Sequence, residues 1–135
     1  MRIMFDTNFL ISAFVFGGKI EKLLDLIYDK GYDIYVTEYI DSEFHNVVNK
    51  KFSSRKEKIF SKYAERNFKI YPSTTEILGK VRDEKDIPVL SDAIFHEVDI
   101  LLTGDKDFLE SEIENPLIMS PITLFEYLNK NSWHA

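Results

Sequence analysis

The residues of this chain best suited to chemistry are four carboxylates, each standing where the local pattern predicts a strand end or a helix start: Asp6, Glu43, Asp86 and Asp105. Asp6 follows the apolar run at residues 3–5, and Asp105 follows a strand-like run at residues 100–103. In parallel α/β sheets, ligands bind outside the carboxyl ends of the strands, so acids delivered there by separate elements can converge in one pocket. Because crowded carboxylates repel one another, such a pocket normally holds a hard divalent cation.

Short polar segments around the first and last of these acids strengthen the pattern. Thr7 and Asn8 follow Asp6 and can hydrogen-bond nearby backbone, which would hold the carboxylate in one orientation. The alternative for Asp6 is an N-cap of the helix that begins at Phe9, and one residue can do both. Residues 103–107, Thr-Gly-Asp-Lys-Asp, bring a glycine for close backbone approach and two acids that alternate across a turn. The alternative there is an ordinary loop-initiating turn.

The two middle acids rest on weaker local evidence. Glu43 lies near the apolar face of a predicted helix and can point into a pocket, although most acids on helices face solvent. Asp86 comes just before Pro88 and a predicted helix, where the helix dipole favours an anion. Neighbouring acids compete for the same roles: Glu38 and Asp41 with Glu43, and Asp83, Glu84 and above all Asp92 with Asp86.

The elements that must position these acids follow from the spacing of apolar residues. Strands are predicted at 2–5, 34–37, 68–71, 100–103 and 117–119, and helices at 9–16, 20–30, 39–51, 54–67, 88–97 and 123–129, with a weaker one at 75–79. Strands that alternate with helices imply a parallel sheet covered on both faces. We therefore predict an α/β fold, a three-layer α/β/α sandwich with a central, mainly parallel sheet of four to five strands, in one domain spanning residues 1–135.

Length and composition narrow the class of protein. The chain has 135 residues, of which 44% are hydrophobic, and this fits one domain with an ordinary core. No apolar run approaches the roughly 18 residues of a membrane span, and Asp6 interrupts the start where a signal peptide would stay apolar. Cysteine is absent, which excludes disulfides and thiolate zinc sites and suits the cytoplasm. The three histidines, His45, His96 and His134, are too dispersed for a local metal motif.

One segment of the chain is basic although the whole is acidic. Residues 50–69 hold eight basic side chains against two acidic ones, a local charge of +6, so the net charge of −6 leaves −12 for the remainder. A basic segment on an acidic protein can steer a phosphate backbone toward one face. The alternative is a solvated helix face. We expect Lys50, Lys51 and Arg55 to contact nucleic acid.

Taken together, the order and spacing of these residues resemble the PIN-domain family of metal-dependent ribonucleases, which includes the VapC-type toxins of toxin–antitoxin pairs. The resemblance covers nearly the whole chain, from Ile-Met-Phe-Asp-Thr-Asn at 3–8 to Ser-Pro-Ile-Thr-Leu-Phe at 120–125. Between these lie Asp-Ser-Glu-Phe at 41–44, Lys-Asp-Ile-Pro-Val-Leu at 85–90 and Thr-Gly-Asp-Lys-Asp-Phe-Leu at 103–109. Each motif is short, but their joint order in a chain of this size is fairly specific.

The resemblance implies an Mg²⁺- or Mn²⁺-dependent endoribonuclease whose catalytic residues are the four acids Asp6, Glu43, Asp86 and Asp105. Three of these would bind the metal together with a frequent fifth acid, so the implied metal ligands are Asp6, Asp86, Asp105 and Asp107. Asn8 and Thr103 look like supports for those ligands. The family further implies an RNA substrate, an antitoxin partner, a homodimer and no membrane association.

Three other functions compete with that of a toxin. One is a PIN nuclease that processes RNA without being a toxin. Another is an aspartyl phosphotransferase or phosphatase, which also places an Asp at the end of the first strand. However, Asn8 stands where one such class needs a second Asp, and residues 103–107 stay unexplained. The last is a binding module whose acidic groove accepts a basic partner, which hydrolysis assays with and without metal would distinguish from a nuclease.

Overall fold

Five parallel strands form the centre of the protein, in the order β3-β2-β1-β4-β5. They are β1 (Arg2–Phe5), β2 (Asp33–Thr37), β3 (Ile70–Tyr71), β4 (Ile100–Leu102) and β5 (Leu117–Met119). The computed structural model describes residues 1–132, so His134 lies outside the described part. In the register of the sheet, Ile3 of β1 lies between Ile34 of β2 and Ile100 of β4. β1 and β4 are almost continuously apolar and buried, as expected of parallel strands covered on both faces.

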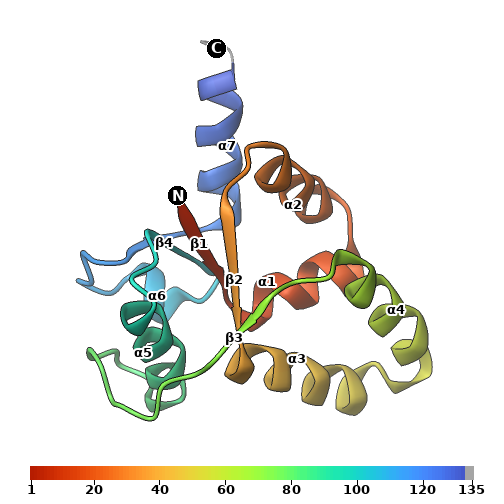
Figure 1. Cartoon of the computed structure of the whole chain (residues 1–135), viewed down its shortest axis with the longest axis horizontal. Coiled ribbons are helices and arrows are strands. Elements are labelled where there is room, and N and C mark those ends of the chain that lie inside the picture. Colours follow the sequence, from red (N-terminus) through yellow and green to blue (C-terminus); the bar gives the residue numbers. More distant parts are fainter. Residues whose placement is uncertain (133–135) are drawn as a thin grey trace.

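Helices cover the two faces of this sheet. In chain order they are α1 (Thr7–Ile11), the π-helix η1 (Ser12–Phe16), α2 (Lys19–Asp29), α3 (Glu38–Lys51), the 3₁₀ turn η2 (Ser53–Arg55), α4 (Lys56–Arg66), the 3₁₀ turn η3 (Glu84–Asp86), α5 (Ile87–Phe95), α6 (Lys106–Leu109) and α7 (Pro121–Ser132). Figure 1 shows α1 to α4 on one side of the strands and α5 and α6 on the other, with α7 beside α2. The predicted α/β/α sandwich with a parallel sheet is therefore confirmed. None of the helices within residues 1–132 is both long enough and apolar enough to cross a membrane.

The order of the strands places a crevice at one end of the sheet. The chain builds outward from β1 to β2 and β3, and then returns to the other side of β1 to form β4 and β5. The direction of winding thus reverses between β1 and β4, and ligands of open α/β sheets bind outside the carboxyl ends of strands at such a point. Asp6 directly follows β1, and Thr103 directly follows β4.

Aromatic rings fill the layer between the sheet and the first helices. Phe5 lies 4.5 Å from Phe9, and Phe14 lies 6.1 Å from Phe44, measured between ring centroids. All four rings are buried. Phe16, two residues further along η1, is the exception, with 69% of its surface exposed.

The connection between β3 and α5 differs from the prediction. The helix expected at 75–79 is absent, and residues 72–83 run over α5 without regular structure. Two buried side chains of α5 capture backbone groups of this segment: the Asp92 carboxylate accepts from the Thr74 N–H at 2.8 Å, and the Ser91 hydroxyl accepts from the Leu78 N–H at 2.9 Å. Because these N–H groups are bound to α5, they are not available for a local helix. The short helix α6 was not predicted from the sequence.

Asp92 is the anchor of this connection. Its second oxygen accepts from the Ser73 hydroxyl at 2.7 Å, and that hydroxyl in turn accepts from the Tyr39 N–H at 2.9 Å. Asp92 is 1% exposed, whereas Ser73 and Thr74 are half-buried. The sequence analysis considered Asp92 as an additional acid of the site, whereas its two oxygens here bind the 73–74 segment.

We predict that Asp92→Ala lowers the free energy of unfolding by roughly 2 kcal/mol, because it removes the charged acceptor of the part-buried Ser73 and Thr74 donors. Chemical denaturation followed by circular dichroism would measure the loss. Glu76→Ala, an exposed acid of the same connection, should change stability by less than about 0.5 kcal/mol. Equal effects of the two substitutions would refute the anchoring role.

Candidate active site

The four acids singled out from the sequence come from four different elements and meet at the carboxyl end of the sheet. Asp6 caps the start of α1, and Asp105 caps the start of α6. Glu43 lies in the second turn of α3, and Asp86 ends η3 immediately before α5. The acids are close enough to act on one another: besides burial, the charges of Glu43 and Asp105 raise the pKa of Asp6, and those of Asp105 and Asp6 raise the pKa of Asp86.

Asp6 is the most firmly held of these carboxylates. One oxygen accepts from the Thr7 N–H and the other from the Thr103 hydroxyl, each at 2.7 Å, and the residue is 6% exposed. Burial raises the pKa of Asp6 above its ordinary value, and the two hydrogen bonds oppose but do not cancel this rise. The backbone of Asp6 also donates to the Leu102 carbonyl at 3.1 Å, which fixes the end of β1 to β4.

Thr103 joins two of the acids. Its hydroxyl donates to Asp6 and accepts from the Asp105 N–H at 3.0 Å, so a single buried side chain orients one carboxylate and the backbone of another. Asn8, the other support expected from the sequence, is exposed and makes no side-chain hydrogen bond with any described residue. The orienting contact on that side of Asp6 is instead the backbone N–H of Thr7.

Asp86 is perturbed both by burial and by the neighbouring acids. Burial, then the charges of Asp105, Asp6 and Asp83, raise the pKa of Asp86 from an ordinary 3.8 to about 7. One of its oxygens is buried and has no hydrogen-bond partner among the described residues. Carboxylate oxygens of Asp83, Asp86 and Asp107 also lie within 4.8 Å of one another. An orphaned oxygen among several carboxylates is a donor set that suits a hard divalent cation.

Glu43 is held by a residue that the sequence analysis did not single out. The Tyr39 hydroxyl, one turn earlier on α3, donates to Glu43 Oε2 at 3.2 Å. Burial and then the charge of Glu43 raise the pKa of Tyr39 to about 12, so the phenol keeps its proton and stays a donor. A Tyr four residues before a candidate acid on a helix is the signal that would have identified it, because side chains at that spacing lie side by side.

The acids that competed with Glu43 have other partners. Glu38 accepts from the Ser73 N–H at 3.1 Å, and Asp41 accepts from the Tyr63 hydroxyl at 2.7 Å. Burial and this hydrogen bond both raise the pKa of Tyr63. Of the three acids on this stretch of α3, Glu43 is the one whose charge acts on Asp6.

Asp107 lies at the outer edge of the cluster, and an arginine neutralises it. The Arg82 guanidinium donates to Asp107 Oδ1 through Nε at 3.1 Å and also through Nη2, and Nη2 lies 3.9 Å from Glu110. Asp107 therefore belongs to the acidic group with Asp83 and Asp86 and is also half of an ion pair. Sequence reasoning missed Arg82. Asp83, which competes with Asp86 on sequence grounds, lies in this acidic group, and its side chain accepts from the Lys85 N–H at 3.0 Å.

The basic segment begins at the far end of the helix that carries Glu43. Lys50 and Lys51 are in the last turn of α3, Arg55 is in η2, and all three are exposed. Seven residues separate Glu43 from Lys50, which is about 10 Å along the helix axis. Positive and negative surfaces thus lie close together on one helix.

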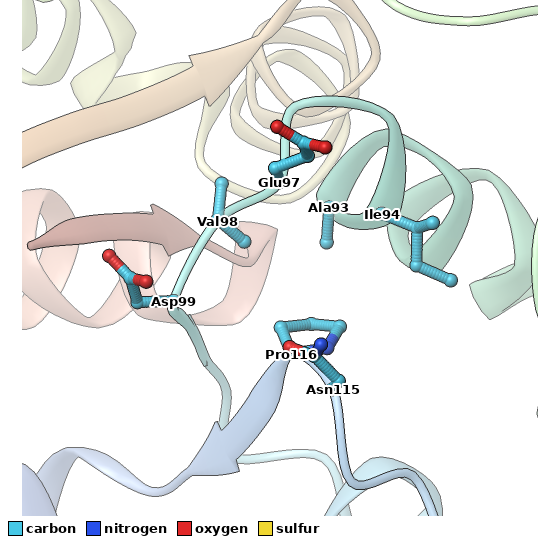
Figure 2. Close-up of a pocket in the computed structure, with 7 residues that line it drawn as sticks. All are labelled: Ala93, Ile94, Glu97, Val98, Asp99, Asn115 and Pro116. Atoms are coloured by element: carbon cyan, nitrogen blue, oxygen red, sulfur yellow. The ribbon is translucent and has the colours of Figure 1, made fainter.

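A separate hollow lies at the opposite end of the sheet. This cavity of about 390 Å³ is lined by residues before β4 and β5 and by the end of α5, including Glu97, Asp99 and Pro116. Figure 2 shows the carboxylates of Glu97 and Asp99 pointing away from Pro116 rather than toward a common point. Asp99 accepts from the Arg2 N–H at 2.7 Å, which ties the start of β4 to β1. This cavity has no convergent polar groups comparable to those at the carboxyl end.

Comparisons with known proteins bear on the fold and the family of the chain. A family model described as the PIN domain matches residues 2–107. Among solved structures, the chain is similar to a crystal structure of VapBC2 from Rickettsia felis bound to a DNA fragment from its promoter. The TM-score is 0.68 and the sequence identity is 18%, over 89% of this chain and 98% of that chain. A search of curated proteins found no match.

The raised pKa of Asp86 predicts how stability depends on pH in the absence of metal. Between about pH 4 and 7 the unfolded chain releases the Asp86 proton but the folded protein retains it, so rising pH costs stability over this window. Asp86→Asn removes that contribution. In EDTA, the melting temperature of Asp86→Asn should therefore exceed that of the wild type at pH 8, and the difference should shrink toward pH 5. Asp29→Asn, an exposed acid on α2, serves as the control, and an identical pH profile for the two variants would contradict the prediction.

Proposed function

The chain belongs to the PIN domain family, and from that premise we propose that it is a metal-dependent ribonuclease that hydrolyses phosphodiester bonds of RNA. The observation that carries the proposal is the group of carboxylates around Asp86, with its buried unpartnered oxygen and a pKa of about 7. A fold does not need such a costly arrangement, whereas a catalytic cation would relieve it.

The residues present fit Mg²⁺ or Mn²⁺, which prefer oxygen ligands. Asp6, Asp86 and Asp105 would hold the cation, and Asp107 would join them on release from Arg82. When bound, the cation would neutralise charge on the phosphate and lower the pKa of an attacking water.

The chain's own residues would prepare the site for hydrolysis. Thr103 and the Thr7 N–H fix the direction of the Asp6 carboxylate before substrate arrives. Glu43, steadied by the Tyr39 hydroxyl on Oε2, would orient the attacking water and accept its proton. The proton retained by Tyr39 keeps its hydroxyl a donor to Glu43 Oε2.

We further propose that the protein is the toxin of a toxin–antitoxin pair, acts in the cytoplasm and forms a homodimer. The similarity in fold to VapBC2 supports an antitoxin partner. Arg82 already forms an ion pair with Asp107 within this chain. An arginine of the antitoxin would enter the acidic site and form an ion pair of the same kind between the two proteins. A neighbouring reading frame for a short DNA-binding protein would support this role.

Substitution of Asp105 tests the catalytic proposal without removing the helix cap. Asn retains an oxygen able to accept from the Asp107 N–H, so the start of α6 should persist in Asp105→Asn. We expect cleavage of single-stranded RNA to fall by at least roughly a hundredfold, because a metal ligand is removed. Mn²⁺ should also raise the melting temperature of the variant less than that of the wild type. Asp29→Asn controls for the change in charge, and cleavage that resists both EDTA and Asp105→Asn would refute the proposal.

Substitution of the basic segment tests where RNA binds. Changing Lys50, Lys51 and Arg55 together to Gln should weaken RNA binding and reduce the slope of log affinity against log salt by about 0.7 for each phosphate that the variant no longer neutralises. The matched control converts Lys19, Lys22 and Lys30 on or beside α2, which are also exposed and change the net charge equally. Equal effects of the two triple variants would show that only the net charge matters.

A further inference from the structure

A pair of aromatic rings, Phe16 and Phe52, meets at the surface outside the acidic site. Phe16, at the end of η1, is 69% exposed, and its ring meets the ring of Phe52 edge to face with 5.8 Å between centroids. Phe52 follows α3 and is half-buried. Other phenylalanines of the first helices, Phe9 and Phe14, are buried. Phe52 packs against the core, and the exposed ring of Phe16 extends this apolar surface outward, so the two rings form a local apolar platform.

Cations lie on the Phe52 side of the platform, whereas the Glu21 carboxylate lies close to Gly17 on the Phe16 side. The Arg55 guanidinium lies 5.7 Å from the centroid of Phe52, and Lys51 and Lys56 are its exposed neighbours in the chain. Within residues 1–132, none of these three cations forms an ion pair with a carboxylate. Their charge is therefore available to a ligand.

Two helices lead from the acidic site to this platform. α1 with η1 begins at Asp6 and ends at Phe16, while α3 carries Glu43 and ends just before Phe52. α1 and α3 contact each other after leaving the neighbouring strands β1 and β2. At about 1.5 Å per residue, the ten residues from Asp6 to Phe16 and the nine from Glu43 to Phe52 both correspond to roughly 15 Å or less.

We propose that Phe16 and Phe52, together with Arg55, form a stacking subsite for an unpaired base of single-stranded RNA. Exposed aromatic rings beside cations are the combination that binds single strands, because bases stack on the rings while the cations follow the phosphates. A base within a duplex is already stacked on its neighbours and is not available to the rings. The inference rests on the proposed function for the identity of the nucleic acid, and it adds a preference for unpaired substrate held at a distance from the cleaved bond.

The charge of the surroundings argues against a second copy of the chain as the occupant. In a symmetric dimer the same patch would face itself, and residues 50–69 carry a charge of +6. Two such segments would repel each other, whereas a phosphate backbone is attracted. RNA is therefore the occupant that the charge favours.

Binding without turnover tests this subsite. The affinity of a fluorescein-labelled single-stranded RNA of mixed sequence would be measured by fluorescence anisotropy in EDTA, at several salt concentrations. We expect Phe16→Ala to bind about tenfold more weakly with an unchanged salt slope, because the stacking is removed while the cations still bind the phosphates. Phe16→Trp should retain the affinity of the wild type. Phe95→Ala, which removes a 50% exposed ring of α5 on the other face of the sheet, is the matched control.

Three results would overturn the inference: unchanged affinity in Phe16→Ala, an equal loss of affinity with Phe95→Ala, or an equal loss with a blunt RNA duplex. A dimer that dissociates in Phe16→Ala without a change in RNA affinity would also overturn it, since a second copy would then cover the ring. Melting curves of the variants verify folding, which an exposed ring should not determine. A protein that binds RNA through Phe16 but does not cleave it would refute only the proposed ribonuclease. One that cleaves RNA and binds it equally well in Phe16→Ala would refute only the subsite.

Discussion

Mutual repulsion between carboxylates at the ends of β1 and β4 is the constraint around which this end of the molecule is organised. Asp6 tolerates nearly complete burial because the Thr7 N–H and the Thr103 hydroxyl both donate to it. One oxygen of Asp86 has no partner among the described residues, and burial followed by the charges of Asp105, Asp6 and Asp83 raises the pKa of Asp86 to about 7. The same proximity that destabilises the metal-free protein is what a divalent cation requires, so stability and the proposed activity oppose each other at Asp86.

Hydrogen bonds outside this cluster determine which acids take part in it. The chain has 23 acidic residues, and several of them lie within a few positions of those at the carboxyl end of the sheet. Asp92 is bound to the 73–74 segment and Asp41 to Tyr63, so neither carboxylate is free to turn toward Asp6. Glu43 has only the weaker contact with Tyr39 at 3.2 Å, which orients its carboxylate and leaves it beside Asp6.

Opposite charges are separated along the first helices rather than mixed. α3 begins among the acids and ends in Lys50 and Lys51, an arrangement that also suits the helix dipole. Beyond it, Phe52 and Phe16 add an apolar surface beside the cations of the basic segment. The surface proposed to bind RNA and one of the acids proposed to cleave it, Glu43, are therefore joined by one helix.

The sequence by itself determined the layers of the fold and the two strongest motifs. Parallel strands buried on both faces are continuously apolar, so β1 and β4 can be identified from their sequences. An acid that directly follows such a strand must lie at the carboxyl end of the sheet. Only the tertiary structure shows which acid of α3 lies toward Asp6. Glu38, Asp41 and Glu43 lie within two turns of one helix, and their spacing in the sequence does not reveal which side of that helix faces the end of β1. The tertiary structure also determines that residues 75–79 do not form a helix. Backbone N–H groups in or next to this segment donate to buried side chains of α5, which lie more than ten residues further along the chain. These hydrogen bonds replace those that a local helix would have made.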